Sequence, residues 1–119
     1  MIKTIQDLHE HLQWAIELEH ATIPPYLCAL YSIKDNSNQE SIEVIQSVFI
    51  EEMLHMALVA NIMIATGGKP QLDYPEFIAR YPTPLPHSDK SFEVNLNKFS
   101  PESIECFLKI ERPAEADAP

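Results

Sequence analysis

Prolines are distributed unevenly along this chain, and their positions limit where long helices can form. Eight of the ten prolines lie at or beyond residue 70, whereas residues 1–66 contain only Pro24 and Pro25. Proline removes a backbone donor and crowds the preceding turn, so the second half cannot hold a long uninterrupted helix. The sequence therefore predicts an all-α single domain over 1–119: a helical hairpin over 1–66, a proline-rich loop over 67–99, a short helix over 100–112 and a polar tail over 113–119.

Local signals mark the expected ends of the two long helices. Thr4 is a candidate N-cap for the first helix, and Ser37 is one for the second. Gly67 and Gly68 follow the expected end of the second helix near Thr66, as is usual where a helix ends. Pro24 and Pro25 fall inside the apolar pattern of the first helix, so we expect a kink there rather than an end.

Composition and charge narrow the classes of partner. Acidic residues outnumber basic ones 18 to 8, and the formal charge is −10. Nucleic acids and anionic membranes need a basic face, so neither is expected as a partner. The apolar runs are short and no secretory signal is visible, so no membrane span is expected. With only two cysteines and no cysteine motif, a cytoplasmic setting is expected.

Glu19 is a carboxylate at the centre of an apolar stripe. On a helical wheel of about 100° per residue, six apolar residues fall within roughly 40° of it. Glu17 lies nearly opposite, on a face expected to be solvated, and His20 lies on a flank. The six apolar neighbours of Glu19 on the wheel are Leu8, Leu12, Ala15, Ile23, Tyr26 and Leu30.

The second helix repeats this arrangement around Glu52. His55 lies one turn further on, about 60° away, so a carboxylate and an imidazole share the apolar face. Glu51 lies on the flank. This helix is apolar almost all round, which is typical of a helix buried between neighbours and implies a partner. The apolar residues within roughly 40° of Glu52 are Ile45, Val48, Met56, Val59 and Met63.

Buried carboxylates need compensation, and a metal ion is the natural counter-ion. An unpaired buried carboxylate costs several kcal/mol, and no basic residue lies near Glu52 in the sequence. Carboxylates with one imidazole suit iron or manganese, with zinc possible. Two alternatives stay open: a lone Glu-x-x-His is usually a surface pair, and the acids could instead be protonated or paired across an interface. The predicted metal ligands are Glu19, Glu52 and His55.

The remaining histidines and methionines have simpler interpretations. His9, His11 and His87 are expected on the solvated surface. The methionines of the second helix are expected to fill the core, because thioether sulfur is a poor ligand for hard metal ions.

Two stretches of the sequence resemble a known family. The segments 12–27, LQWAIELEHATIPPYL, and 51–58, EEMLHMAL, resemble the ferritin-like domain of the iminophenyl-pyruvate dimer synthase family. Shorter segments at 67–70, 81–82 and 110–113 resemble it as well, so the likeness covers nearly the whole chain. Some members of that family act in bis-indole pigment pathways, where two aryl-pyruvate imines are coupled oxidatively.

The resemblance implies a ferritin-like helical bundle with a di-metal, expected di-iron, centre. It implies that Glu19, Glu52 and His55 are metal ligands, and that the protein is an O₂-dependent oxidoreductase for a small aromatic substrate derived from an amino acid. The family domain is longer, however, and no histidine follows His87 here. One copy therefore holds half of a four-carboxylate, two-histidine site. We expect a homodimer or a missing C-terminal half; a non-catalytic helical interaction module is the alternative function.

Overall fold

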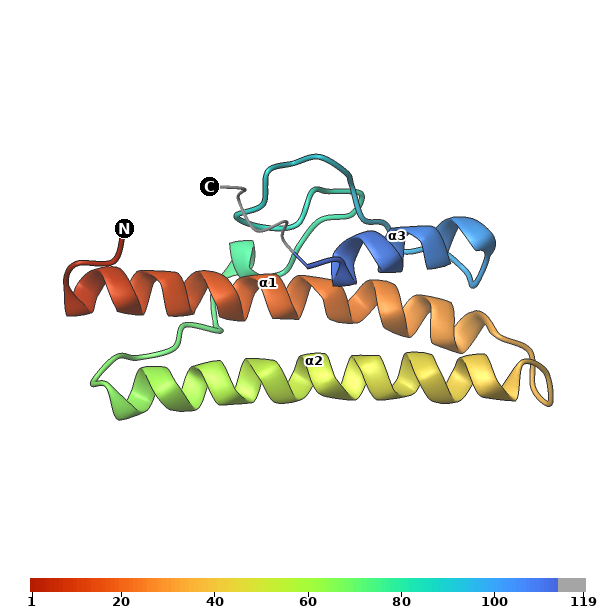
Figure 1. Ribbon diagram of the computed structural model, residues 1–119, viewed down its shortest axis with the longest axis horizontal. Helices are drawn as coiled ribbons and strands as arrows, with labels where there is room; N and C mark the ends of the chain where they lie inside the picture. Colours follow the sequence, from red (N-terminus) through yellow and green to blue (C-terminus); the bar gives the residue numbers. More distant parts are fainter. Residues whose placement is uncertain (114–119) are drawn as a thin grey trace.

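Two long antiparallel helices dominate the computed structural model, which describes residues 1–113. Helices α1 (Ile5–Ser32) and α2 (Gln39–Ala65) lie side by side, as Figure 1 shows. A short 3-10 helix, η1 (Pro75–Phe77), and helix α3 (Pro101–Glu111) follow. The described residues form no named strand, only one antiparallel bridge between Thr83 and Val94. The all-helical fold predicted from the sequence is confirmed.

The helix ends agree with the sequence signals in most places. Thr4 caps α1, since its hydroxyl accepts a hydrogen bond from the Asp7 amide at 3.0 Å, and α1 continues through Pro24 and Pro25. The prediction of Ser37 as the N-cap of α2 is wrong. Asn38 holds that position in a left-handed conformation without a side-chain capping bond, because the Ser37 hydroxyl donates to the carbonyl of Lys34 instead.

The proline-rich loop packs against the middle of α1. Val94 is fully buried and shares a small core with Leu85 and Ala21. The Tyr81 hydroxyl donates to the Ala21 carbonyl at 2.7 Å, which anchors the loop to α1. Figure 1 shows the later part of this loop and α3 above α1, whereas the segment that follows α2 crosses from α2 toward α1. The expected tail beyond residue 113 lies outside the described residues.

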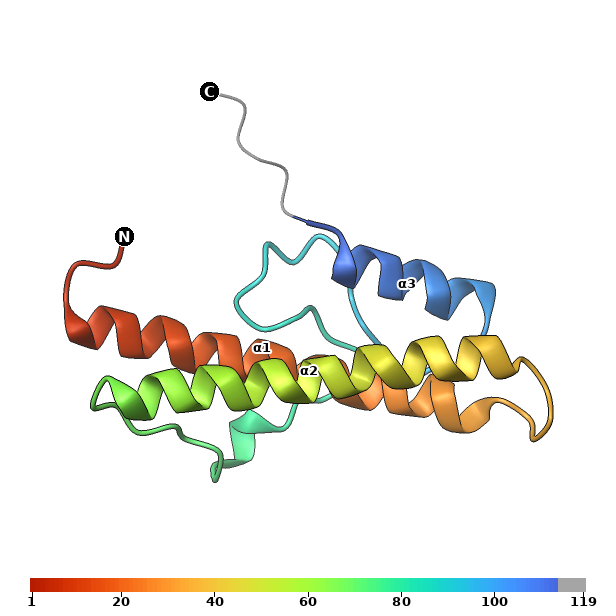
Figure 2. The same ribbon diagram turned by 60° about the horizontal axis from the view of Figure 1, so that its bottom comes forward.

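Helix α2 contacts α1 along its length but presents an apolar outer face to solvent. In Figure 2, where the lower side of Figure 1 comes forward, α2 lies in front with no other segment over it. The expectation that α2 is buried between neighbours is therefore not met by residues 1–113. The half-exposed apolar residues of α2 are Val44, Ile50, Met53, Leu54, Leu58, Ile62 and Ile64.

The same apolar character gives α2 the length and composition of a membrane-spanning helix. Its most apolar stretch has a mean hydropathy of 1.6. Core helices of water-soluble proteins share these properties, and Glu52 and His55 at the middle of α2 would be costly in hydrocarbon. The helix alone does not indicate a membrane protein.

Candidate metal centre

The structure brings Glu19, Glu52 and His55 together midway along the helical hairpin. Glu19 comes from α1, and the other two come from successive turns of α2. One ligand atom from each residue lies within 4.8 Å of the others. His55 Nδ1 is 3.7 Å from Glu19 Oε2 and 3.9 Å from Glu52 Oε1, too far for direct hydrogen bonds.

Burial is graded across this cluster. The side chains of Glu52, Glu19 and His55 are 9%, 22% and 49% exposed, respectively. The cluster is therefore closed on the side between α1 and α2 and open at His55, where α2 meets solvent. An ion held by the two carboxylates could keep a coordination position accessible on the His55 side.

One carboxylate oxygen of this cluster has no partner. Glu19 Oε2 is buried and makes no hydrogen bond. Burying such an oxygen without compensation costs free energy, and a metal ion is one form of compensation. The second carboxylate is better satisfied, because Thr22 Oγ1 lies 3.2 Å from Glu52 Oε2 and 2.8 Å from the Glu19 carbonyl oxygen.

The two carboxylates interact strongly enough to shift protonation. Desolvation by burial, followed by the hydrogen bond and negative charge of Glu19, raises the pKa of Glu52 to about 7, against smaller opposing effects of Thr22 and His55. Without a metal, the pair is therefore expected to keep one proton well above the ordinary pKa of a glutamate. Bound metal would displace that proton, because the ligating form of a carboxylate is the ionised one.

A cavity of about 210 Å³ adjoins the cluster and reveals a residue that sequence reasoning missed. Glu111, the last residue of α3, lines this cavity together with Glu52 and His55. The Tyr26 hydroxyl donates to Glu111 Oε1 at 2.5 Å. Burial, followed by this bond, raises the pKa of Tyr26. Helical spacing places Glu111 on the same face of α3 as Ser103 and Phe107, both buried, but does not indicate which segment that face contacts.

Glu17 was expected on the solvated face, but its side chain is only 21% exposed; His87 is exposed, as expected, although it contacts Glu17. Glu17 accepts hydrogen bonds from Tyr74 Oη and from His87 Nε2, the latter at 2.5 Å. His87 also stacks on Trp14, with ring centroids 4.7 Å apart. Partial burial raises the pKa of Glu17, but the bonds from Tyr74 and His87 outweigh it and hold the pKa below its ordinary value. These contacts tie the loop to α1 and lie outside the metal cluster.

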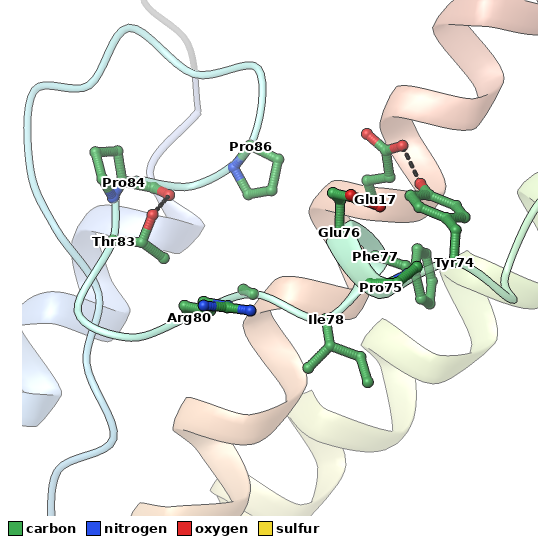
Figure 3. Close-up of a pocket in the computed structure, with 11 residues that line it drawn as sticks. Glu17, Tyr74, Pro75, Glu76, Phe77, Ile78, Arg80, Thr83, Pro84 and Pro86 are labelled. Carbon is green, nitrogen blue, oxygen red and sulfur yellow. Dashed lines mark hydrogen bonds between the residues drawn. The ribbon is translucent and has the colours of Figure 1, made fainter.

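A surface cavity of about 500 Å³ lies on this other side of α1, next to the Glu17–Tyr74 contact. Figure 3 shows Glu17 and Tyr74 on one side of it and Arg80 and Thr83 on the loop opposite. It contains none of the three predicted ligands. The larger cavity and the metal cluster are thus separate features, and only the smaller cavity offers converging carboxylates and an imidazole.

His20 follows Glu19 directly but points elsewhere. Its ring stacks on Phe77 with centroids 4.3 Å apart, and burial lowers its pKa. His20 Nδ1 is buried without a partner. The structure therefore keeps His20 on the flank of α1, as expected, and outside the group of Glu19, Glu52 and His55.

Metal-free protein is expected to lose stability as the pH rises from about 4.5 to about 7. The pKa of Glu52 is raised from 4.5 to about 7, so the folded state binds more protons than the unfolded chain across this window. The stability that comes from the protonated Glu52 is fully present below pH 4.5, the pKa of this group in the unfolded chain. It is lost as the pH rises through about 7, the pKa in the folded state. It amounts to roughly 3 kcal/mol at most, because one pKa unit is worth about 1.4 kcal/mol. Urea unfolding at a series of pH values, with a chelator present, measures it.

The control for this experiment is Glu17→Gln. The pKa of Glu17 is lowered in the fold, so its contribution is lost as the pH falls and has the opposite sign. Glu17→Gln should therefore leave the decline between pH 4.5 and 7 in place. A stability that stays flat or rises over that window in the wild-type protein would contradict the raised pKa of Glu52.

Comparison with known proteins yields one match. A family model described as Ferritin-like matches residues 12–118. No curated protein and no solved structure matches the chain.

Proposed function

Because the chain belongs to the ferritin-like family, we propose that it holds a divalent transition metal, iron in the first instance, at Glu19, Glu52 and His55. Ferritin-like folds commonly bind pairs of metal ions through glutamates and Glu-x-x-His segments. The observation that carries this proposal is the buried, unpartnered Glu19 Oε2 within a three-residue ligand group contributed by two helices.

The donor set suits this class of metal. Two carboxylates and one imidazole balance the charge of one dication and match the preferences of iron and manganese, with zinc also possible. The proton shared by the acidic pair would leave when the metal binds, and Thr22 would keep Glu52 oriented from the side facing α1. The Tyr26 hydroxyl would hold the Glu111 carboxylate beside the same cavity.

The activity we propose is an O₂-dependent oxidation of a small aromatic substrate derived from an amino acid, as in iminophenyl-pyruvate dimer synthase. Iron held by Glu19, Glu52 and His55 would supply electron transfer to O₂. Coupling two imine molecules through a new carbon–carbon bond releases two protons and two electrons, which reduce O₂ to hydrogen peroxide. The cavity of about 210 Å³ is smaller than the usual ligand pocket of about 300–1,000 Å³. The substrate would therefore bind at its mouth, and the substrate class rests on the resemblance of residues 12–27 and 51–58.

Metal binding is tested by titrating metal-free protein with Fe(II), Mn(II) or Zn(II) in the absence of O₂. We expect saturable binding of one ion per chain, a metal-dependent rise in melting temperature, and loss of both in His55→Ala. Stabilisation follows because the ion binds the folded state and not the unfolded chain. Glu43→Gln removes an exposed carboxylate of the same helix and should bind metal normally. Unchanged affinity in His55→Ala, or no saturable binding in the wild type, would overturn the proposal.

A second candidate is a non-catalytic helical interaction module. The half-exposed apolar face of α2 favours it. Under this alternative the acidic pair stays protonated, and the protein binds no metal even when Fe(II) is supplied. The same titration therefore separates the two functions.

A further inference from the structure

The exposed side of α2 carries the spacing of a helix-pairing seam. Six residues follow one another at alternating intervals of four and three, which is the pattern of a helix that packs along its length against another. Val44, Leu58 and Ile62 are between 50% and 56% exposed, and Val48 is partly buried. We call these six residues the α2 seam: Val44, Val48, Glu51, His55, Leu58 and Ile62.

The α2 seam is symmetric about its own centre. Two apolar residues stand at each end, and the two polar residues stand in the middle. When α2 is laid antiparallel on a copy of itself, Val44 faces Ile62, Val48 faces Leu58, and Glu51 faces His55. The two residue numbers of every pair have the same sum, as pairing about a single two-fold axis requires. No shift of register is needed to match apolar with apolar and acid with imidazole.

We propose that the partner of this face is a second copy of the chain, packed with its α2 antiparallel along the α2 seam. Hydrogen bonding and the charge of Glu51 decide the direction. Antiparallel packing places a ring N–H of each His55 opposite the partner's Glu51 carboxylate, which can accept it, whereas parallel packing would place the two Glu51 carboxylates against each other. Like charges in direct opposition are destabilising. Figure 2 shows α2 in front with no other segment over it. Helix α3 borders the α2 seam, since Ile104 lines a surface cavity with Val44 and Glu111 lines one with His55, but Val44 and His55 stay about half exposed.

The pairing would also complete the metal centre, and this part of the inference rests on the proposed function. His55 belongs both to the α2 seam and to the ligand group, so the two groups would meet across the interface. Two copies supply four carboxylates and two imidazoles, the set found in two-metal bundles. Each His55 would bind metal through one ring nitrogen and donate its other N–H to the partner's Glu51, an arrangement that orients metal-bound histidines.

Sedimentation of metal-free protein tests the interface independently of metal. We expect a dimer at micromolar concentration, and at least a tenfold weaker dimer for Leu58→Lys, which places charge in the apolar seam. Met53→Lys is the matched control. Met53 is 49% exposed, against 50% for Leu58, but lies on the opposite flank of α2, so this variant should remain dimeric. A monomeric wild type, or equal effects of the two substitutions, would overturn the proposal.

Disulfide cross-linking tests the direction of pairing. In a background of Cys28→Ala and Cys106→Ala, Val48→Cys combined with Leu58→Cys should give a covalent dimer under oxidising conditions. Each single cysteine variant alone should not. Self-linking of the Val48→Cys variant would indicate parallel helices and overturn the antiparallel arrangement.

Metal content measured on the same samples separates the two proposals. A dimer that binds no metal retains the interface and overturns the metal site. A monomer that binds one ion tightly retains the metal site and overturns the interface.

Discussion

Glu52→Gln is expected to abolish tight metal binding while making the metal-free protein more stable at pH 8. Glutamine keeps the size of the side chain and can still hydrogen-bond to Thr22, but it removes one of two anionic ligands. Loss of residues that only orient metal ligands already costs about 10- to 100-fold in affinity, so loss of a ligand should cost at least about 100-fold. Calorimetric titration with Fe(II) or Zn(II) measures the loss.

The gain in stability has a separate cause. At pH 8 Glu52 is ionised, buried and next to Glu19, which is the reason for its raised pKa. Glutamine removes that repulsion and the desolvation of a charge, so the free energy of unfolding should increase by up to roughly 3 kcal/mol at pH 8 and little at pH 4.5. Glu43→Gln should change neither quantity. A variant less stable than the wild type at pH 8, or one that still binds metal tightly, would contradict this account.

Tyr26→Ala is expected to destabilise the protein by about 3–5 kcal/mol, the usual cost of truncating a large buried aromatic residue. Tyr26 is 2% exposed and packs against Phe107 of α3, with ring centroids 4.5 Å apart. It joins α1 to α3 both through this contact and through the hydrogen bond to Glu111. Urea unfolding of metal-free protein measures the loss.

Tyr31→Ala provides the matched comparison, because Tyr31 lies on the same helix but is 78% exposed. It should change stability by no more than about 0.5 kcal/mol. If Tyr26→Ala fails to fold, Tyr26→Phe still tests the hydrogen bond and should cost about 1 kcal/mol. Similar unfolding midpoints for the Tyr26→Ala and Tyr31→Ala variants would show that α3 does not depend on this contact.

The helical hairpin and its three candidate ligands could be predicted from local patterns in the sequence. Helical periodicity over residues 1–66 reports which side of each helix is apolar, because burial and spacing are linked at 3.6 residues per turn. A carboxylate at the centre of such a stripe, as at Glu19 or Glu52, must face the interior whatever the rest of the chain does. Their convergence in the structure follows once two such helices pack together. The metal they are proposed to bind stays a prediction.

Contacts between segments far apart in the chain could not be predicted from such local patterns. Glu17 lies on the polar side of its helix, and nothing local indicates that Tyr74 and His87 return to meet it. Glu111 enters the cavity because α3 packs through Phe107 onto Tyr26. The N-cap of α2 was predicted at Ser37, one residue before its observed position at Asn38. The Ser37 hydroxyl instead donates a hydrogen bond to the Lys34 carbonyl.

The sequence alone determined the two long helices, the proline-rich segment that follows them, and the inward placement of Glu19 and Glu52, because periodicity, proline and caps act within a few residues of the chain. Only the tertiary structure decided which α2 residues stay exposed, where the loop attaches, and that Glu111 joins the cavity. Those outcomes depend on how α3 and the loop close over α1 and the adjoining side of α2, leaving the outer face of α2 bare. Such closure is fixed by packing between segments far apart in the chain, and no local pattern records it.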